Sequence, residues 1–370
     1  MSETAELSIV IPTFNEVGNV GILVEKLEAQ FDGLRWEALF VDDDSSDGTR
    51  DALILLAQEK PHVRMIQRIG RRGLSSAVVE GILSTTAPYI VVMDADLQHD
   101  ESLLPAMLDV LRDSDTEIVV GSRYMAGGGV GEWAQSRIRI SQFAGWLARK
   151  VTRSQLSDPM SGFFMLKRAA FDRSVRKLSR EGYKILLDIF ASAPEPVKFE
   201  ELPYVFRVRE HGESKLDSLV IWEYLVLLLD KMFGRFLPVR FMMFGMVGGS
   251  GVFVHFAALW VCFRLLGVEF AIAQGIATFV AMNSNFFLNN ILTYRDRRLR
   301  GTRLVWGLLS FYAICGLGVV GNVNVADIVF DSLNTVTPGY SWAVAGAAGA
   351  LISVVWNYVV TAWFTWRRRN

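Results

Sequence analysis

The sequence holds very few cysteines and histidines. Of its 370 residues only two are cysteines, Cys262 and Cys315, and four are histidines. Both cysteines lie in apolar segments and have neither the spacing of a disulfide framework nor that of a structural zinc site. The formal net charge is −1, which indicates no general preference for polyanions. We therefore expect no disulfide-rich module, no zinc domain and no nucleic-acid partner.

Common phosphate-binding and targeting motifs are also missing. No G-x-G-x-x-G follows the first predicted strand, and G-x-x-x-x-G-K-[ST] does not occur, so neither a dinucleotide oxidoreductase nor a P-loop NTPase is expected. Residues 1–6 are polar, and the apolar run Leu7–Pro12 is too short for the core of a signal peptide. We therefore expect the N-terminal domain to stay in the cytoplasm.

Apolar residues are abundant instead, and they are concentrated in the second part of the chain. Hydrophobic residues make up 51% of the sequence and the mean hydropathy is +0.28, which is high for a soluble protein. Four segments approach the ~20 apolar residues that a membrane-spanning helix needs. They are Phe241–Phe263, Val268–Leu292, Leu304–Phe330 and Trp342–Phe364.

The charged residues between these segments predict their orientation. Arginines crowd residues 295–303 and 367–369, whereas residues 331–341 contain no lysine or arginine. By the positive-inside rule, both termini and the middle loop face the cytoplasm. We therefore predict a multi-pass protein of the cell membrane, with a membrane domain of four transmembrane helices over residues 237–370.

Residues 218–236 join this membrane domain to the preceding one. The stretch is apolar but is interrupted by Glu223, Asp230, Lys231 and Arg235. This pattern is typical of an amphipathic helix that lies along the membrane surface and contacts its lipids. A core helix of the preceding domain is the alternative interpretation.

Short apolar runs alternate with helical patterns through the first part of the chain. The predicted strands are Leu7–Pro12, Ala38–Val41, Val63–Ile66, Tyr89–Met93 and Glu117–Gly121, and the helices between them are Val17–Gln30, Asp47–Glu59, Leu74–Leu83 and Leu103–Leu111. This alternation predicts an α/β domain over residues 1–217, with a Rossmann-like, mostly parallel sheet and helices on both faces. Ligands of such sheets bind beyond the carboxyl ends of the strands.

Two carboxylates directly follow the predicted strand Tyr89–Met93. Asp94 and Asp96 are two residues apart, so in an extended segment both side chains point the same way and can face one divalent cation. A Mg²⁺ or Mn²⁺ held by one or two carboxylates keeps its other positions for substrate phosphates and water. The pattern favours a metal-dependent enzyme that acts on a diphosphate, and two solvated acids at a strand end are the alternative.

Six motifs follow one another in a characteristic order. They are Pro12–Glu16 (PTFNE), Val41–Thr49 (VDDDSSDGT), Asp94–His99 (DADLQH), Gly121–Tyr124 (GSRY), Asp158–Phe163 (DPMSGF) and Arg209–Lys215 (REHGESK). The series resembles the inverting family 2 glycosyltransferases with the GT-A fold, and among them the dolichyl-phosphate (polyprenyl-phosphate) mannose synthases. The later part of the chain resembles the GtrA-like membrane domain, through Arg240-Phe241, Val247-Gly248 and the stretch Asn283–Thr293 with Tyr294 and Arg295.

The resemblance implies roles for individual residues. The base and ribose of a nucleotide would contact Pro12, Phe14, Glu16, Val41 and Asp43. The metal would be held by Asp94, Asp96 and Gln98, with the backbone of Ala95 close by. Phosphates would face Arg123, Arg137, Arg209 and Lys215, and these four cations with Asp96 form the predicted catalytic set. Phe14 stands where the family usually has tyrosine, so a hydroxyl is lost and a stacking face is kept.

The resemblance also implies a reaction. It is the inverting transfer of mannose from GDP-mannose to a dolichyl or polyprenyl monophosphate at the cytoplasmic face of the membrane, with Mg²⁺ or Mn²⁺ as cofactor. An acceptor phosphate with a second pKa of ~6 is largely ionised at pH 7, so it needs no general base. The scarcity of histidine agrees with this. The protein's task is then to bring two anions together and to stabilise the departing diphosphate.

Several alternatives remain open at this point. The donor would be UDP-glucose or another UDP-sugar in one of them, and in another the membrane half acts as a flippase for the lipid-linked sugar. A processive polysaccharide synthase is disfavoured, because no Q-x-x-R-W motif occurs.

Some residues also have two interpretations. The basic loop with Arg68, Arg71 and Arg72 either contacts the donor or is solvated, and His99 is either a metal ligand or a structural residue. The asparagines of the second predicted span either bond between helices or line a lipid path. We expect the glycines at 245, 248, 249 and 251 to permit close packing of helices.

Overall fold

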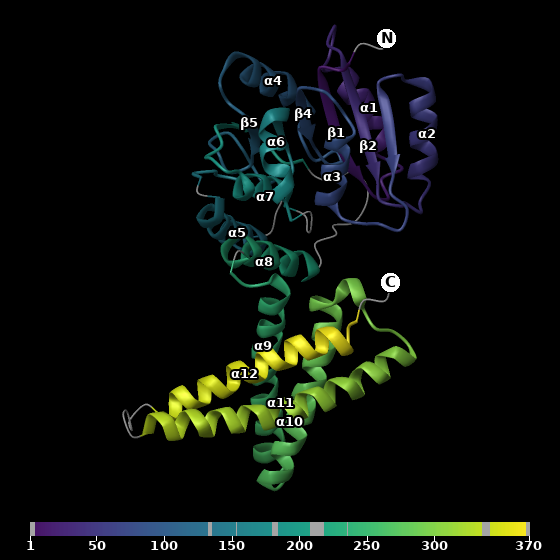
Figure 1. Ribbon diagram of the computed structural model, residues 1–370. Helices are drawn as coiled ribbons and strands as arrows, with labels where there is room; N and C mark the ends of the chain where they lie inside the picture. Colours follow the sequence, from purple (N-terminus) through teal and green to yellow (C-terminus); the bar gives the residue numbers. More distant parts are fainter. Residues whose placement is uncertain are drawn as a thin grey trace. The chain divides into compact units, whose positions relative to one another are not determined.

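The computed structural model divides the chain into two compact units, Met1–Met232 and Phe233–Asn370 (Figure 1). It describes residues 4–131, 135–152, 154–179, 184–207, 218–234, 236–334 and 341–367.

A seven-stranded sheet organises the first unit (Figure 1). Its strands are β1 (Leu7–Thr13), β2 (Trp36–Asp42), β3 (Val63–Gln67), β4 (Tyr89–Val92), β5 (Ile118–Ser122), β6 (Phe164–Lys167) and β7 (Phe199–Pro203). Their order across the sheet is β3-β2-β1-β4-β6-β5-β7. Of these strands, β6 alone runs antiparallel to its neighbours, β4 and β5. The predicted mostly parallel sheet is therefore confirmed.

Helices connect the strands and cover both faces of the sheet. They are α1 (Val20–Glu28), α2 (Thr49–Glu59), α3 (Leu74–Leu83), α4 (Leu104–Asp113), α5 (Gln135–Thr152), α6 (Arg168–Ser174), α7 (Ile185–Ser192) and α8 (Ser218–Phe233). Alternate residues of a strand point to opposite faces of the sheet, so β1 contributes side chains to two hydrophobic cores, one on each face. Its Ile9 packs with Leu23 of α1, whereas Val10 packs with Val78 of α3. The strand is apolar throughout because both of its faces are covered.

The last helix of the first unit, α8, packs against α5 and α7. Its buried residues Tyr224, Leu227 and Leu228 form a small core with Ala148 of α5 and Leu187 of α7. One face of α8 is therefore committed to the first unit.

An ion pair holds the C-terminal end of α8. The Nζ atom of Lys231 lies 2.6 Å from Oδ1 of Asp188 on α7, and both side chains are buried. The backbone N–H and the hydroxyl of Ser179 donate to Oδ2 of the same carboxylate, each at 2.8 Å. The pair gives each of these buried charges a partner in the docked position of α8, which offsets the cost of removing them from water.

Four long helices make up the second unit (Figure 1). They are α9 (Val239–Trp260), α10 (Phe270–Leu288), α11 (Thr302–Asn334) and α12 (Ser341–Phe364), with short turns η3 (Val261–Leu265), η4 (Asn289–Thr293) and η5 (Arg295–Arg297). Helix α9 packs along α10, and α11 packs along α12. Among the described residues, two segments are long and apolar enough to cross a membrane, Val239–Leu265 and Phe270–Thr293. The predicted count of four spans stays a prediction.

Two asparagines of the second unit bond between segments, as the sequence predicted. The hydroxyl of Tyr312 on α11 donates to Oδ1 of Asn283 on α10 at 2.8 Å. The indole Nε1 of Trp366 donates to Oδ1 of Asn290 at 3.1 Å. These bonds confirm the structural interpretation of both asparagines.

The glycines of α9 differ from one another. A Cβ atom on Gly251 would lie 2.3 Å from Oδ1 of Asn285, so here glycine permits the close approach of α9 and α10. A Cβ atom on Gly245, Gly248 or Gly249 would meet no described atom within 4 Å. The expectation of close packing is therefore confirmed for Gly251 and wrong for the other three.

Candidate functional site

Three of the six motifs meet at one edge of the sheet. Strand β1 pairs in parallel with β2 on one side and with β4 on the other, so the carboxyl ends of all three strands lie together. The motif residues at these ends are Pro12–Glu16, which begin within the last two residues of β1, Asp43 directly after β2, and Asp94–Gln98 shortly after β4. The structure thus brings together the segments predicted to bind the nucleotide and the metal.

The loop after β1 is joined to the loop after β2 by hydrogen bonds. Asn15 has a φ of 54°, and its N–H donates to the Oγ atom of Ser45 at 2.8 Å. Its side-chain Oδ1 accepts a hydrogen bond from the N–H of Ser46 at 3.0 Å. The N–H of Glu16 donates to Oγ1 of Thr49, also at 2.8 Å. These bonds fix the backbone directly after Phe14.

Asp43 is held by a buried arginine, Arg68. A guanidinium N–H of Arg68 donates to Oδ1 of Asp43, and the N–H of Gly73 donates to Oδ2 at 2.7 Å. Burial raises the pKa of the Asp43 carboxyl, while Gly73 and Arg68 oppose that shift. Arg68 also donates to Ser76 at 2.6 Å, and its Nε lies 3.2 Å from Glu80. Only 3% of its side chain is exposed. Arg68 is therefore not a solvated residue, because its guanidinium anchors the loop from inside.

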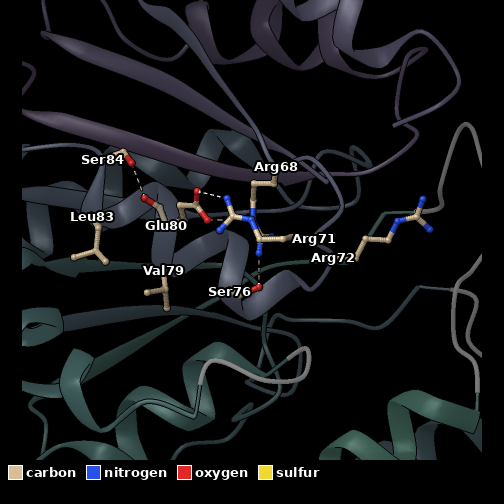
Figure 2. A pocket seen from close by; sticks show the side chains of 8 residues that line it. All are labelled: Arg68, Arg71, Arg72, Ser76, Val79, Glu80, Leu83 and Ser84. Atoms are coloured by element: carbon tan, nitrogen blue, oxygen red, sulfur yellow. Dashed lines mark hydrogen bonds and ion pairs between the residues drawn. The ribbon is translucent and has the colours of Figure 1, made fainter. Parts of the chain in front are cut away.

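A hollow of about 580 Å³ lies beside this anchor (Figure 2). Arg71 pairs there with Glu80, at 3.0 Å between Nη2 and Oε1. Figure 2 shows Arg72 pointing away from that pair. Its guanidinium carbon lies 4.3 Å from the centroid of the Phe14 ring, a cation–π contact. Arg68 and Arg71 thus share Glu80 as an ion-pair partner, whereas Arg72 contacts Phe14.

The two acids after β4 differ in their exposure. The side chain of Asp94 is 34% exposed, whereas Asp96 is buried and its Oδ1 accepts the N–H of Gln98 at 3.2 Å. The side-chain Nε2 of Gln98 donates to the carbonyl of Arg207 at 2.9 Å. That bond assigns the amide nitrogen to Arg207, which leaves the amide oxygen as the atom suited to a cation.

This donor set fits a hard divalent ion. Among the residues that the structure describes, no group of three or more His, Cys, Asp or Glu side chains is placed to hold a metal. Two carboxylates and an amide oxygen are hard oxygen ligands of the kind that Mg²⁺ and Mn²⁺ prefer. Because such ions usually keep water and substrate phosphates as further ligands, two protein carboxylates are sufficient.

His99 supports Asp94 as a neutral ring. Its Nδ1 accepts the backbone N–H of Asp94 at 3.1 Å, which assigns the ring proton to Nε2, 3.9 Å from Oδ2 of the same residue. Burial lowers the pKa of His99 to about 4. The ring stacks on Phe163, with centroids 5.1 Å apart. Because Nδ1 already serves Asp94 and Nε2 carries the proton, the structure favours the structural interpretation of His99 over a metal ligand.

Arg123, the predicted phosphate contact after β5, is held by Asp158. Its Nε and Nη2 donate to Oδ2 and Oδ1 of Asp158 at 2.7 and 2.9 Å, and Asp158 is fully buried. Burial alone would lower the pKa of Arg123, but the hydrogen bonds and charge of Asp158 outweigh it and raise that pKa. Arg123 is therefore a permanent cation with a fixed orientation.

Glu201 on β7 in turn holds the loop that carries Asp158. The N–H of Asp158 donates to Oε1 of Glu201 at 3.2 Å, and the N–H of Ser157 donates to Oε2 at 2.9 Å. Sequence reasoning quoted Asp158 within a motif without a role and missed Glu201 altogether. In the sequence Glu201 is marked only as the second of two consecutive acids in a short strand.

Of the predicted phosphate contacts besides Arg123, only the backbone of Arg137 is among the described residues. Arg137 is in α5, one helical turn before Ser141, whose hydroxyl accepts a bond from Tyr124 at 2.8 Å. The side chain of Arg137 and all of Arg209 and Lys215 lie outside the described residues.

Two small apolar residues of the predicted set are buried. Val41 is fully buried and packs in the core with Val78 of α3, so its side chain does not reach a nucleotide at the sheet edge. Ala95 is also buried, at 2% exposure.

Comparison with known proteins places the chain in a family. Residues 8–175 match the family model of glycosyl transferase family 2, and residues 243–367 match that of the GtrA/DPMS transmembrane domain. The dolichol-phosphate mannosyltransferase of Pyrococcus furiosus is 35% identical over 366 residues, which cover 98% of this chain and 99% of that protein. The chain belongs to the dolichol-phosphate mannosyltransferase family. The Saccharomyces cerevisiae protein of the same name is 38% identical over 229 residues, 60% of this chain and 84% of that one.

Membership in the dolichol-phosphate mannosyltransferase family confirms the resemblance seen in the six motifs. It also confirms a GT-A catalytic domain of glycosyltransferase family 2, followed by a GtrA/DPMS membrane domain, and hence a membrane protein. Among solved structures, glucosyl-3-phosphoglycerate synthase of Mycobacterium tuberculosis, in complex with Mn²⁺, UDP and glucosyl-3-phosphoglycerate, is 18% identical. It covers 61% of this chain and 80% of its own, with a TM-score of 0.46. A similarity this low carries no inference about the site.

Proposed function

We propose that this protein transfers mannose from GDP-mannose to a dolichyl or polyprenyl monophosphate, with inversion at the anomeric carbon. The observation that carries this proposal is the 35% identity to a dolichol-phosphate mannosyltransferase along nearly the whole of both chains. The sheet edge supports it, because Phe14, Asp43 and the pair Asp94–Asp96 follow the carboxyl ends of three adjacent parallel strands. The product would be a polyprenyl-phosphate mannose for glycan assembly.

In this proposal the donor occupies that edge. The segment Pro12–Glu16 and Asp43 contact the nucleoside, while Asp94, Asp96 and Gln98 hold Mg²⁺ or Mn²⁺. When bound, the cation neutralises charge on the leaving diphosphate. The bonds of Asn15 and Glu16 to the loop after β2 preorganise the nucleoside contacts before substrate arrives.

The acceptor phosphate is already a nucleophile at pH 7, so the protein needs cations to hold it rather than a base. Arg123 suits this role, because Asp158 fixes its orientation and keeps it charged. A guanidinium removed from bulk water binds a phosphate more strongly than an exposed one. Arg137, Arg209 and Lys215 complete the proposed set. An acceptor oxygen that attacks opposite the leaving diphosphate inverts the anomeric centre.

We further propose that the catalytic domain covers residues 1–217 and lies in the cytoplasm. Residues 218–236 would lie at the membrane surface, and residues 237–370 would cross the cell membrane several times with both termini inside. The two apolar helices and the arginines of residues 295–303 support this arrangement.

Sugar transfer by the detergent-purified full-length protein tests the proposal. GDP-mannose and UDP-glucose are supplied separately with a short polyprenyl phosphate, in Mg²⁺, Mn²⁺ or EDTA. We expect metal-dependent mannosyl-lipid, lost in Asp96→Asn and kept in Asp109→Asn, a matched change of an exposed acid on α4. Glucosyl-lipid as the sole product would contradict GDP-mannose as the donor. Undiminished transfer in EDTA or in Asp96→Asn would contradict the proposed metal site.

A further inference from the structure

A second hollow, of about 670 Å³, lies within the four-helix unit and is lined by three arginines. Arg240 comes from the first turn of α9, Arg297 from η5 and Arg367 from the residues after α12. No acidic side chain is found among the described residues that line it. Three segments far apart in the sequence therefore contribute positive charge to one cavity, and none of its arginines is among the residues proposed above for sugar transfer.

The wall around Arg297 is rigid. Tyr294 and Trp366 stack with centroids 4.2 Å apart and planes 6° from parallel. The indole of Trp366 donates to Asn290, which also accepts the N–H of Leu299 at 2.8 Å. Arg297 donates from Nη1 to the carbonyl of Trp366 at 3.3 Å. Such a network holds the cavity in shape before any ligand arrives, which lowers the cost of binding.

The cavity lies level with the ends of the apolar segments. The first candidate span begins at Val239, next to Arg240, and the second ends at Thr293, next to Tyr294. The cavity is also lined by Tyr358 and Trp363, and Trp363 is 75% exposed. Aromatic side chains of this kind gather where the hydrocarbon of a bilayer meets its headgroups. The three arginines of the cavity would then lie at the level of the lipid phosphates of a bilayer.

We propose that this cavity of the second unit binds the phosphate headgroup of an anionic membrane lipid. Guanidinium groups bind phosphate in two-pronged fashion, and basic pockets at the ends of membrane helices suit lipid headgroups. The aromatic wall open to the bilayer would receive the start of the acyl or prenyl chain. An anionic phospholipid and a polyprenyl phosphate share this chemistry.

Native mass spectrometry of the full-length protein, without sugar donor, measures this binding. The protein is titrated separately with phosphatidylglycerol, phosphatidylcholine, a short polyprenyl phosphate and inorganic phosphate. The cavity variant is Arg240→Gln with Arg367→Gln. Its control is Arg300→Gln with Arg303→Gln. These two arginines, just before α11 and in its first turn, are exposed and do not line the cavity. At about 1 kcal/mol for each arginine near a lipid headgroup, the cavity variant should bind anionic lipid roughly 30-fold more weakly.

The outcomes separate the sources of the phosphate. Preference for phosphatidylglycerol identifies a membrane phospholipid, and preference for polyprenyl phosphate identifies a holding site for the acceptor; both support the proposal. Equal losses in the two variants would reduce the effect to diffuse surface charge and overturn it. Displacement of lipid by inorganic phosphate would overturn it in favour of a soluble anion. If the cavity variant unfolds, the titrations of the unaltered protein still test the proposal. Equal binding of phosphatidylcholine and phosphatidylglycerol would contradict a site for anionic headgroups.

Discussion

Arg123 and Asp158 form a two-pronged ion pair in which both partners are almost completely removed from water. Replacement of Asp158 by asparagine should therefore leave a buried cation without its counter-ion. Breaking a buried pair in this way costs about 3 to 5 kcal/mol. Thermal unfolding of the purified protein should show a clear fall in stability, together with a loss of transfer.

A double variant separates charge from packing at this pair. Arg123→Met combined with Asp158→Asn removes both charges, so it should recover part of the lost stability while transfer stays low. Recovery of transfer in the double variant would contradict a direct role of Arg123 at the phosphate.

Glu201→Gln should reduce transfer without touching a substrate. The variant keeps its length but weakens two hydrogen bonds from the backbone of residues 157 and 158, at a cost of about 1 to 3 kcal/mol. Because these bonds place Asp158, we expect a lower kcat with little change in the KM for the donor. Glu200→Gln is the matched control, since Glu200 is the neighbouring residue of β7, points to the opposite face of the strand and accepts from the hydroxyl of Thr116. Equal effects of the two changes would argue against a positioning role.

Arg72→Gln should weaken binding of the donor. The guanidinium of Arg72 lies over the ring of Phe14, and a cation–π contact of this kind contributes about 0.5 to 1 kcal/mol. If Phe14 contacts the nucleoside, the KM for the nucleotide sugar should rise by roughly two- to five-fold. Arg71→Gln removes a charge from the same loop and should leave that KM close to its original value. A rise in both variants would point to the charge of the loop instead.

The stability of the first unit should fall on mild acidification because of His99. Its folded pKa is about 4 and the usual pKa of a histidine is 6.5. Between these values the unfolded chain binds a proton at His99 that the folded chain does not. The stabilisation is complete above pH 6.5 and is lost as the pH falls toward 4, by about 2 kcal/mol at pH 5. Thermal unfolding at pH 7 and pH 5 should show a smaller difference in His99→Gln. An unchanged difference would assign the acid sensitivity to other groups.

The strand ends were predictable, because a short apolar run that stops at acids needs only local sequence to be recognised. Asp94, Asp96 and Asp43 therefore appear where the motifs placed them. The buried ion pair of Arg68 was not predictable. Its partner Asp43 lies 25 residues away in the sequence, and the burial of Arg68 depends on how α3 packs. The burial of Val41 was not predictable for a related reason: in a strand covered on both faces, alternation does not tell which side chains are exposed at the sheet edge.

In the second unit the apolar segments were visible in sequence, but their packing was not. Gly251 and Gly248 occur in the same helix, yet only the first faces a close neighbour among the described residues. Glycine spacing alone does not tell which face of a helix meets its partner. Asn290 could be expected to form hydrogen bonds, whereas its indole partner lies 76 residues further along the chain.

The ion pair of Lys231 with Asp188 limits the length of the linker between the first unit and α9. Beyond Lys231 only the residues numbered 232–238 precede α9, and even fully extended they reach roughly 25 Å. An enzyme confined in this way samples a thin layer next to its membrane anchor instead of the volume of a cell. A substrate dissolved in the same membrane then meets it at an effective concentration that depends on lipid composition, not on cell size.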